Sequence, residues 1–154
     1  MVENTDIEGV FVKQPQPMLD DRGYFMELIK HPFMADFTIK QSSIALTHPG
    51  VIKAFHWHKH QTDIWFGLSG NARCVLYDVR GISPTYKKFM TIYMGEPEQK
   101  LLFIPAGVAH GYQVLGNKPF KLLYFTNQAY DPSNPDEGRI AFDSVGYDWG
   151  VKNR

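Results

Sequence analysis

Short runs of β-branched, aromatic and other apolar residues follow one another along the whole chain, each ended by Gly, Pro, Asn or Asp. The runs favour extended strands, and the residues that end them favour turns. Many short strands with almost no helix are typical of a β-sandwich or a β-barrel. Only His31–Asp36 and a few residues near the C-terminus are compatible with a helix. The predicted strands are Gly9–Lys13, Gly23–Ile29, Phe37–Leu46, Val51–His58, Thr62–Leu68, Ala72–Val79, Lys88–Met94, Lys100–Ile104, Gly111–Leu115 and Phe120–Thr126.

Length and charge limit the possibilities further. The 154 residues fit one domain, with an N-terminal arm over about residues 1–30 and a wrapped C-terminal tail over about residues 127–154. Lys and Arg number 16, as do Asp and Glu, so the charge balance does not favour nucleic acid or an anionic membrane as a partner. The sequence has no run of 18 apolar residues, no signal peptide and one cysteine, Cys74, which lies in an apolar run. We therefore expect a cytoplasmic protein with Cys74 in its core.

Four of the six histidines lie in two short segments. The first segment holds His56, His58 and His60 on alternate positions, so an extended chain would point all three imidazoles the same way. The second delivers His110 after a Pro-x-Gly turn. Imidazole serves readily as a base near neutral pH and as a metal ligand. The two segments therefore predict a functional site that contains His56 and His110.

The histidine segments have the spacings Gly50-x5-His56-x-His58-x4-Asp63-x6-Gly70 and Pro105-x-Gly107-x2-His110. These spacings resemble the two motifs of the cupin superfamily. Three imidazoles and a carboxylate from neighbouring strands are able to bind one divalent metal ion. On this interpretation the metal ligands are His56, His58, Asp63 and His110. The alternative is a cupin that has lost its metal, in which His58 and His60 are pocket or surface imidazoles.

Five further motifs occur in order along nearly the whole chain. They are Asp20-Asp-Arg-Gly-Tyr-Phe-Met-Glu27, Asp78-Val-Arg80 with Ser83-Pro-Thr85, Ile104-Pro-Ala-Gly-Val-Ala-His-Gly-Tyr112, Leu123-Tyr-Phe-Thr-Asn-Gln-Ala-Tyr-Asp-Pro132 and Gly146-Tyr-Asp-Trp149. Together they resemble the dTDP-4-dehydrorhamnose 3,5-epimerase family. The resemblance implies an all-β fold, a double-stranded β-helix (cupin jelly roll). It also implies a homodimer that acts on a nucleotide-linked 4-keto-6-deoxy sugar without a metal or organic cofactor.

The same resemblance assigns the catalytic residues. Inverting a carbon beside a ketone requires a base to remove its proton and an acid to return one from the other face. His56 matches the family's base, and Tyr124 matches its acid. A base histidine needs a carboxylate to fix its tautomer. Asp143 matches that carboxylate, although its segment is about two residues shorter than the family's pattern, and Asp63 is a competing partner.

Substrate-binding residues follow from the resemblance and from phosphate chemistry, since a guanidinium fork matches phosphate oxygens. In the family, the arm that carries the Arg-Gly motif reaches the neighbouring subunit's site. Matches to family residues that contact the nucleotide or the sugar are Arg22, Glu27, Gln41, Lys53, His110 and Tyr130.

Two departures from the family pattern bear on activity. Lys53 stands where the family has an arginine, so a point charge replaces a bidentate fork. Asp63 aligns with a lysine that is associated with the enolate, and an acid there would repel the enolate's charge. The alternatives to an epimerase are therefore a nucleotide-sugar 3,4-ketoisomerase, a metal-dependent cupin such as an oxygenase, and a non-catalytic sugar-binding module.

Overall fold

The computed structural model describes residues 2–30 and 37–150, and these residues form strands, turns and loops but no helix. None of them therefore belongs to a helix that could span a membrane. His31–Asp36, one of the two possible helical segments, lies outside the described residues. The helix considered near the C-terminus is absent as far as Gly150, where the Asp-, Pro- and Gly-rich tail instead packs as a loop.

All ten predicted strands overlap observed strands, and three short strands are additional. The strands are β1 (Val2–Asn4), β2 (Phe11–Lys13), β3 (Pro17–Asp20), β4 (Gly23–Met26), β5 (Gln41–Thr47), β6 (Ile52–Trp57), β7 (Asp63–Ser69), β8 (Asn71–Asp78), β9 (Phe89–Gly95), β10 (Leu101–Ile104), β11 (Val108–Leu115), β12 (Phe120–Thr126) and β13 (Gly138–Arg139).

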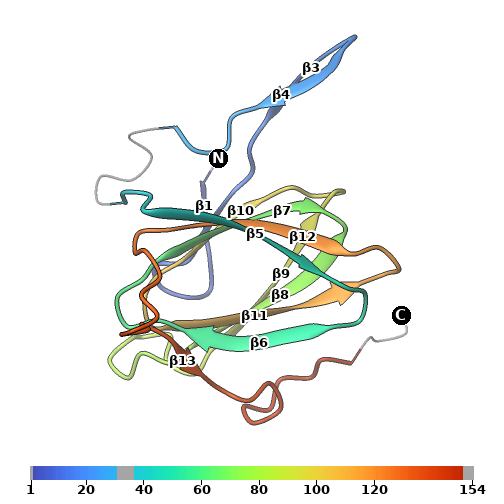
Figure 1. The fold of residues 1–154 in the computed structure, drawn as a ribbon. Helices are drawn as coiled ribbons and strands as arrows, with labels where there is room; N and C mark the ends of the chain where they lie inside the picture. The colour runs from blue at the N-terminus through green and yellow to red at the C-terminus, as the bar shows by residue number, and fades with distance from the viewer. Residues whose placement is uncertain (1, 31–36, 151–154) are drawn as a thin grey trace.

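Two antiparallel sheets pack face to face in the body of the molecule (Figure 1). One sheet has six strands in the order β1-β2-β10-β7-β12-β5, and the other has five in the order β13-β6-β11-β8-β9. Consecutive strands such as β7 and β8 lie in different sheets, as the jelly roll requires. The predicted all-β jelly roll is confirmed.

Side chains alternate along each strand between the space inside the sandwich and its outer faces. On β7, Trp65 points inward and packs edge-on against Tyr112 of β11, while Ile64 and Phe66 pack on the outer face of the six-stranded sheet. Cys74 of β8 is fully buried in the inner core, as predicted. The same alternation turns the polar residues of β6, β7 and β11 inward at one end of the sandwich.

The two terminal segments cover the outer faces of the sheets. Leu28 and Ile29, which follow β4, join the apolar cluster on the six-stranded sheet. Ile140, Tyr147 and Trp149 of the tail pack on the five-stranded sheet. The tail therefore has a fixed path past the end of β6, which matters for the site.

The N-terminal arm is shorter than the sequence suggested, because β1 and β2 belong to the six-stranded sheet. Within the described part of the arm, the β3–β4 hairpin is the segment that projects from the sandwich (Figure 1). Its large apolar side chains are exposed by more than half: Met18 by 54%, Leu19 by 76%, Tyr24 by 61% and Phe25 by 63%. Such an apolar patch on a projecting hairpin is typical of an interaction surface.

Candidate active site

A cavity of about 440 Å³ opens between the sheets. It is lined from β5, β6, β7, β11 and β12 and by residues of the tail. Six residues that the sequence singled out for catalysis or substrate binding line this cavity: Gln41, Lys53, His56, His110, Tyr124 and Tyr130. Residues far apart in the sequence therefore meet in one pocket.

His56 is paired with a carboxylate from the tail. β13 adds to the edge of β6 with Arg139 opposite His56, and this brings Glu137 Oε1 to 3.1 Å from His56 Nδ1. Glu137 also accepts a hydrogen bond of 2.6 Å from Arg139 Nε. A carboxylate at Nδ1 keeps a proton on that nitrogen, so Nε2 is left as the atom that can take up another proton.

The surroundings of His56 and Glu137 lower the pKa of both side chains, which favours a neutral imidazole beside a charged carboxylate. Burial lowers the pKa of His56, and the negative charge of Glu137 only partly opposes that effect. Burial acts to raise the pKa of Glu137, but the hydrogen bond from Arg139 and the charge of His56 outweigh it and hold the pKa below its usual value. A neutral imidazole beside a carboxylate is the state expected near neutral pH.

Asp143 does not occupy the place that the sequence assigned to it. It lies exposed in a turn beyond β13 and is not part of the cavity wall. Among the described residues, the carboxylate that contacts His56 is Glu137. Glu137 takes this place because Gly138 and Arg139, the two residues that follow it, pair with Trp57 and His56 of β6.

The sequence predicted that His56, His58 and His60 all face the same way. Of the three, His56 and His58 line the cavity and His60 does not, because the strand β6 ends at Trp57. Asp136 of the tail accepts backbone N–H bonds of 2.9 Å from each of residues 59–61, which bends the chain away from the strand. His60 is consequently exposed. His58 keeps its place in the cavity wall and donates Nδ1–H to the backbone carbonyl of Asp136.

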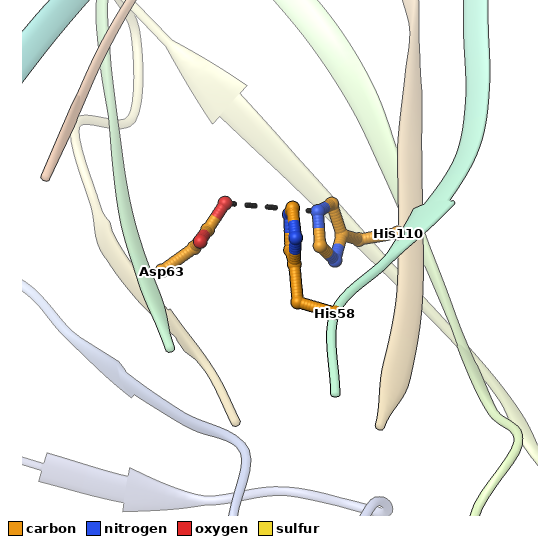
Figure 2. A group of neighbouring side chains, drawn as sticks. All are labelled: His58, Asp63 and His110. Atoms are coloured by element: carbon orange, nitrogen blue, oxygen red, sulfur yellow. Dashed lines mark ion pairs between the residues drawn. The ribbon is translucent and has the colours of Figure 1, made fainter. Parts of the chain in front are cut away.

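His110 and Asp63 form the buried end of the cavity (Figure 2). β11 begins at Val108, three residues before the predicted start, so His110 is a strand residue that points inward. Its Nδ1 lies 2.9 Å from the carbonyl oxygen of Val108, and its Nε2 lies 3.6 Å from Asp63 Oδ2. Burial lowers the pKa of His110, while the charge of Asp63 opposes that effect.

Three of the four predicted metal ligands come together. The candidate ligand atoms of His58, Asp63 and His110 all lie within 4.8 Å of one another. His56 is not in this group; its Nδ1 instead lies 3.1 Å from Oε1 of Glu137. Asp63 is likewise not the partner of His56 that the sequence allowed.

Tyr124, the predicted acid, lies on β12 opposite Trp65 of β7, half-buried in the cavity wall. Nearer the surface, the side-chain oxygen of Gln41 accepts a bond of 2.9 Å from the backbone N–H of Tyr130. This contact attaches the tail to β5. Lys53 is exposed and lines the cavity from β6.

Arg22 and Glu27 are not brought to this chain's own cavity. Arg22 lies in the turn between β3 and β4, where its side chain is 85% exposed and pairs with Asp20. Glu27 follows β4 and lies 3.9 Å from Lys30. Both residues remain candidates for contact with a second molecule.

A jelly-roll cavity that holds a histidine–carboxylate pair and a tyrosine has side chains suited to proton transfer, the chemistry of an isomerase-type enzyme. The chain belongs to the dTDP-4-dehydrorhamnose 3,5-epimerase family, whose family model matches residues 4–154. The resemblance identified from the sequence is thereby confirmed.

Individual relatives agree with this family. The spore coat polysaccharide biosynthesis protein SpsL of Bacillus subtilis (strain 168) is 45% identical over 150 residues, covering 96% of this chain and 99% of that protein. A probable low-salt glycan biosynthesis epimerase, Agl13, of Haloferax volcanii is 31% identical over 153 residues, covering 96% of this chain and 97% of that protein. The solved dTDP-4-dehydrorhamnose 3,5-epimerase from Elizabethkingia anophelis has the same fold, with a TM-score of 0.86 at 24% identity over 99% of this chain and 87% of that one. These findings favour the epimerase over the metal-dependent cupin as the class of protein.

Proposed function

We propose that this protein epimerises a nucleotide-linked 4-keto-6-deoxy sugar by moving a proton at a carbon beside the ketone. The observation that carries the proposal is the His56–Glu137 pair in a cavity that Tyr124 also lines. Nε2 of His56 takes the proton from the carbon, and the electron pair moves onto the ketone oxygen to give an enolate. The hydroxyl of Tyr124 then returns a proton to the opposite face. No electrons are gained or lost overall, so the reaction needs no organic cofactor.

Substrate binding is proposed for the other residues of the cavity wall. Lys53, Gln41 and Tyr130, nearer the surface, are suited to the nucleotide and its phosphates, and His110 to the sugar. A solved relative from Bacillus anthracis contains TDP and pyrophosphate, and one from Legionella pneumophila contains dTDP-4-keto-L-rhamnose. These ligands support a dTDP-linked substrate here. The name of the relative from Bacillus subtilis supports a place in polysaccharide biosynthesis.

A homodimer is part of the proposal. The exposed apolar residues of the β3–β4 hairpin lose their contact with water if a second copy covers them. Arg22, at the tip of that hairpin, and Glu27 then contact substrate in the partner's cavity, where a guanidinium suits phosphate. The single domain and the cytoplasmic location remain predictions from the sequence.

Proton NMR in deuterated water tests the reaction directly. The protein is incubated with dTDP-4-keto-6-deoxyglucose, and the signals of the protons on C3 and C5 are followed. Loss of either signal is expected, and it identifies the carbon that is deprotonated. Formation of a 3-keto product would instead indicate a 3,4-ketoisomerase. No exchange together with tight ligand binding would indicate a sugar-binding module and contradict the proposal.

Variants of the two catalytic residues complete this test. His56→Asn and Tyr124→Phe are each expected to slow turnover at least about 100-fold, the usual contribution of a general base or acid. Matched controls are the exposed His60→Asn and the exposed Tyr93→Phe, which lie outside the cavity wall. Turnover that survives in His56→Asn would show that another group removes the proton.

A further inference from the structure

Gln61 is a residue of the cavity wall that the proposed reaction does not use. It lies in the loop between β6 and β7, next to His58 and Asp63 in the same wall. Its backbone N–H donates a hydrogen bond of 2.9 Å to the carboxylate of Asp136, the residue before Glu137 in the tail. The side chain of Gln61 is half-buried. Its main chain is therefore held by the same segment that carries the partner of the proposed base.

Two acceptors hold the side-chain amide nitrogen of Gln61. This nitrogen lies 2.7 Å from Asp63 Oδ1 and 3.2 Å from His58 Nε2. An ionised carboxylate only accepts hydrogen bonds, so the group beside it is the NH₂ and the orientation of the amide is fixed. His58 donates its Nδ1–H to the backbone carbonyl of Asp136, which leaves Nε2 of the neutral ring as a second acceptor. Both hydrogens of the amide are thus used within the protein.

Asp63 is itself fixed in the cavity wall. It points toward His58 and His110 (Figure 2), and its side chain is almost fully buried. Oδ1 accepts from Gln61, and Oδ2 accepts a hydrogen bond of 3.2 Å from Trp65 Nε1. A lysine, which the family pattern has at this position, carries no acceptor and could not hold the amide nitrogen in this way. The acid at position 63 therefore has a positioning role that a lysine lacks.

The atom of Gln61 that is left for a ligand is its carbonyl oxygen, Oε1. No hydrogen bond within the described part of the chain uses this oxygen. An amide oxygen only accepts, so it is suited to a hydroxyl and not to a ketone oxygen, an enolate oxygen or a phosphate. The donors on a 4-keto-6-deoxy hexose are its hydroxyls on C2 and C3. Gln61 therefore presents an acceptor that matches one of these two groups.

We propose that Gln61 selects the substrate by accepting a hydrogen bond from the hydroxyl on C2 of the sugar. The inference rests on the proposed function, because it concerns the sugar that His56 deprotonates. C3 lies beside the ketone, so its hydroxyl changes direction when that carbon is inverted, whereas the hydroxyl on C2 does not. An acceptor with a fixed position suits a group that keeps its direction through the reaction. Gln61 thus orients the sugar ring between His56 and Tyr124 without moving a proton.

Ligands without a ketone test this contact in the absence of turnover. The affinities of dTDP-glucose and dTDP-2-deoxyglucose for the full chain are measured by calorimetry. Wild type should bind the 2-deoxy ligand about tenfold more weakly, because the acceptor in the cavity wall loses its donor. Gln61→Met keeps the length of the side chain but removes the amide oxygen. In this variant the two affinities should agree within about twofold.

The matched control is Gln128→Met. Gln128 is a half-buried glutamine of the tail that lines a neighbouring hollow and not the cavity, so its replacement should preserve the tenfold difference. Equal affinities for the two ligands in wild type would overturn the proposal without any variant. A merely structural role of Gln61 would weaken both ligands equally in Gln61→Met and preserve their ratio, which also overturns it. Discrimination against dTDP-3-deoxyglucose alone would contradict the assignment to C2.

Proton exchange separates this inference from the proposed function. Wild type should exchange the protons beside the ketone of dTDP-4-keto-6-deoxyglucose with a kcat/KM at least about tenfold higher than for its 2-deoxy analogue, and Gln61→Met should treat the two alike. Discrimination in binding without any exchange contradicts the proposed function and leaves the role of Gln61 standing. Exchange without discrimination overturns the role of Gln61 and leaves the proposed function standing.

Discussion

Nδ1 of His56 lies 3.1 Å from Oε1 of Glu137, and this contact depends on a strand of only two residues. β13 adds to the free edge of β6 immediately after Glu137. The attachment continues at Ile140, which exchanges backbone hydrogen bonds of 2.9 and 3.0 Å with Phe55. The proposed base is therefore oriented by the C-terminal tail, so changes in the tail should affect catalysis.

Glu137→Gln is expected to slow proton exchange at least about 100-fold. An amide carries no charge to stabilise the imidazolium and does not select one tautomer of His56. Glu137 acts by positioning, so the affinity for dTDP, measured by calorimetry, should change less than about threefold while turnover falls. Exchange is measured by proton NMR in deuterated water.

The matched control for that variant is Asp143→Asn. Asp143 is exposed and lies outside the cavity wall, so its exchange rate should stay within about twofold of wild type. Slow proton exchange in Asp143→Asn, together with a normal rate in Glu137→Gln, would show that Asp143 is the partner of His56, as the sequence predicted.

Gly138→Ala should disturb the site without touching a charged group. A Cβ at residue 138 would lie 2.1 Å from Nε1 of Trp57, so either β13 or the indole must move. We expect at least about tenfold slower turnover, because Glu137 moves with the strand. Faster amide hydrogen exchange over residues 137–140 is expected as well. Gly81→Ala is the control, since nothing lies within 4 Å of its Cβ, and similar effects from both variants would contradict this explanation.

The sequence predicted the long strands because their signals are local. Alternating apolar residues and turn residues mark β7, β8 and β12 whatever their partners are. β1, β3 and β13 were missed because they are short and their sequences, Val-Glu-Asn, Pro-Met-Leu-Asp and Gly-Arg, begin or end with polar residues, Pro or Gly. β2, β4 and β10 are equally short, but they lie in longer runs of strand-forming residues. β13 forms through its pairing with the distant strand β6.

The sequence also predicted some residues of the site and missed others. His56, Tyr124 and His110 stand in motifs that resemble a family, and all three line the cavity. The partner of His56 and the end of β6 depend instead on Glu137 and Asp136. These two acids act through the path of the tail, for which the sequence carries no local signal. Only the carboxylate requirement of the base pointed toward such a residue.

The β3–β4 hairpin predicts the oligomeric state. Leu19 and Phe25 are 76% and 63% exposed, so burying them against a second copy favours association by about 1.5–3 kcal/mol for each side chain. We expect wild-type protein to sediment as a dimer at micromolar concentration and the double variant Leu19→Glu, Phe25→Glu to sediment as a monomer.

Ile82→Glu is the control for the hairpin variant. Ile82 is fully exposed in the loop after β8, away from the hairpin, and its replacement should leave the dimer intact. Far-ultraviolet circular dichroism verifies that both variants are folded. A wild-type monomer would refute the dimer, and a dimeric double variant would place the interface elsewhere.

Asp78 should control stability at low pH. Its side chain is fully buried, and it accepts hydrogen bonds from Arg80, Ser83 and Thr85 at 2.6 to 3.0 Å. Burial acts to raise the pKa of Asp78, but these donors outweigh it and hold the pKa well below its usual value. Asp78→Asn leaves the Arg80 guanidinium without its charged partner and should lower the free energy of unfolding by about 3 kcal/mol at pH 7.

The stabilisation that Asp78 provides should decrease as the pH falls. Because the pKa of Asp78 is lower in the folded state, its stabilising contribution is complete above the unfolded value of about 3.9 and is lost as pH falls toward the folded value. Urea unfolding at pH 7 and at pH 3 should therefore show a smaller difference between wild type and Asp78→Asn at the lower pH. Asp21→Asn, which changes an exposed carboxylate, should match wild type at both. If the difference in free energy of unfolding between wild type and Asp78→Asn is the same at both pH values, the variant is destabilised by altered packing and not by the lost charge.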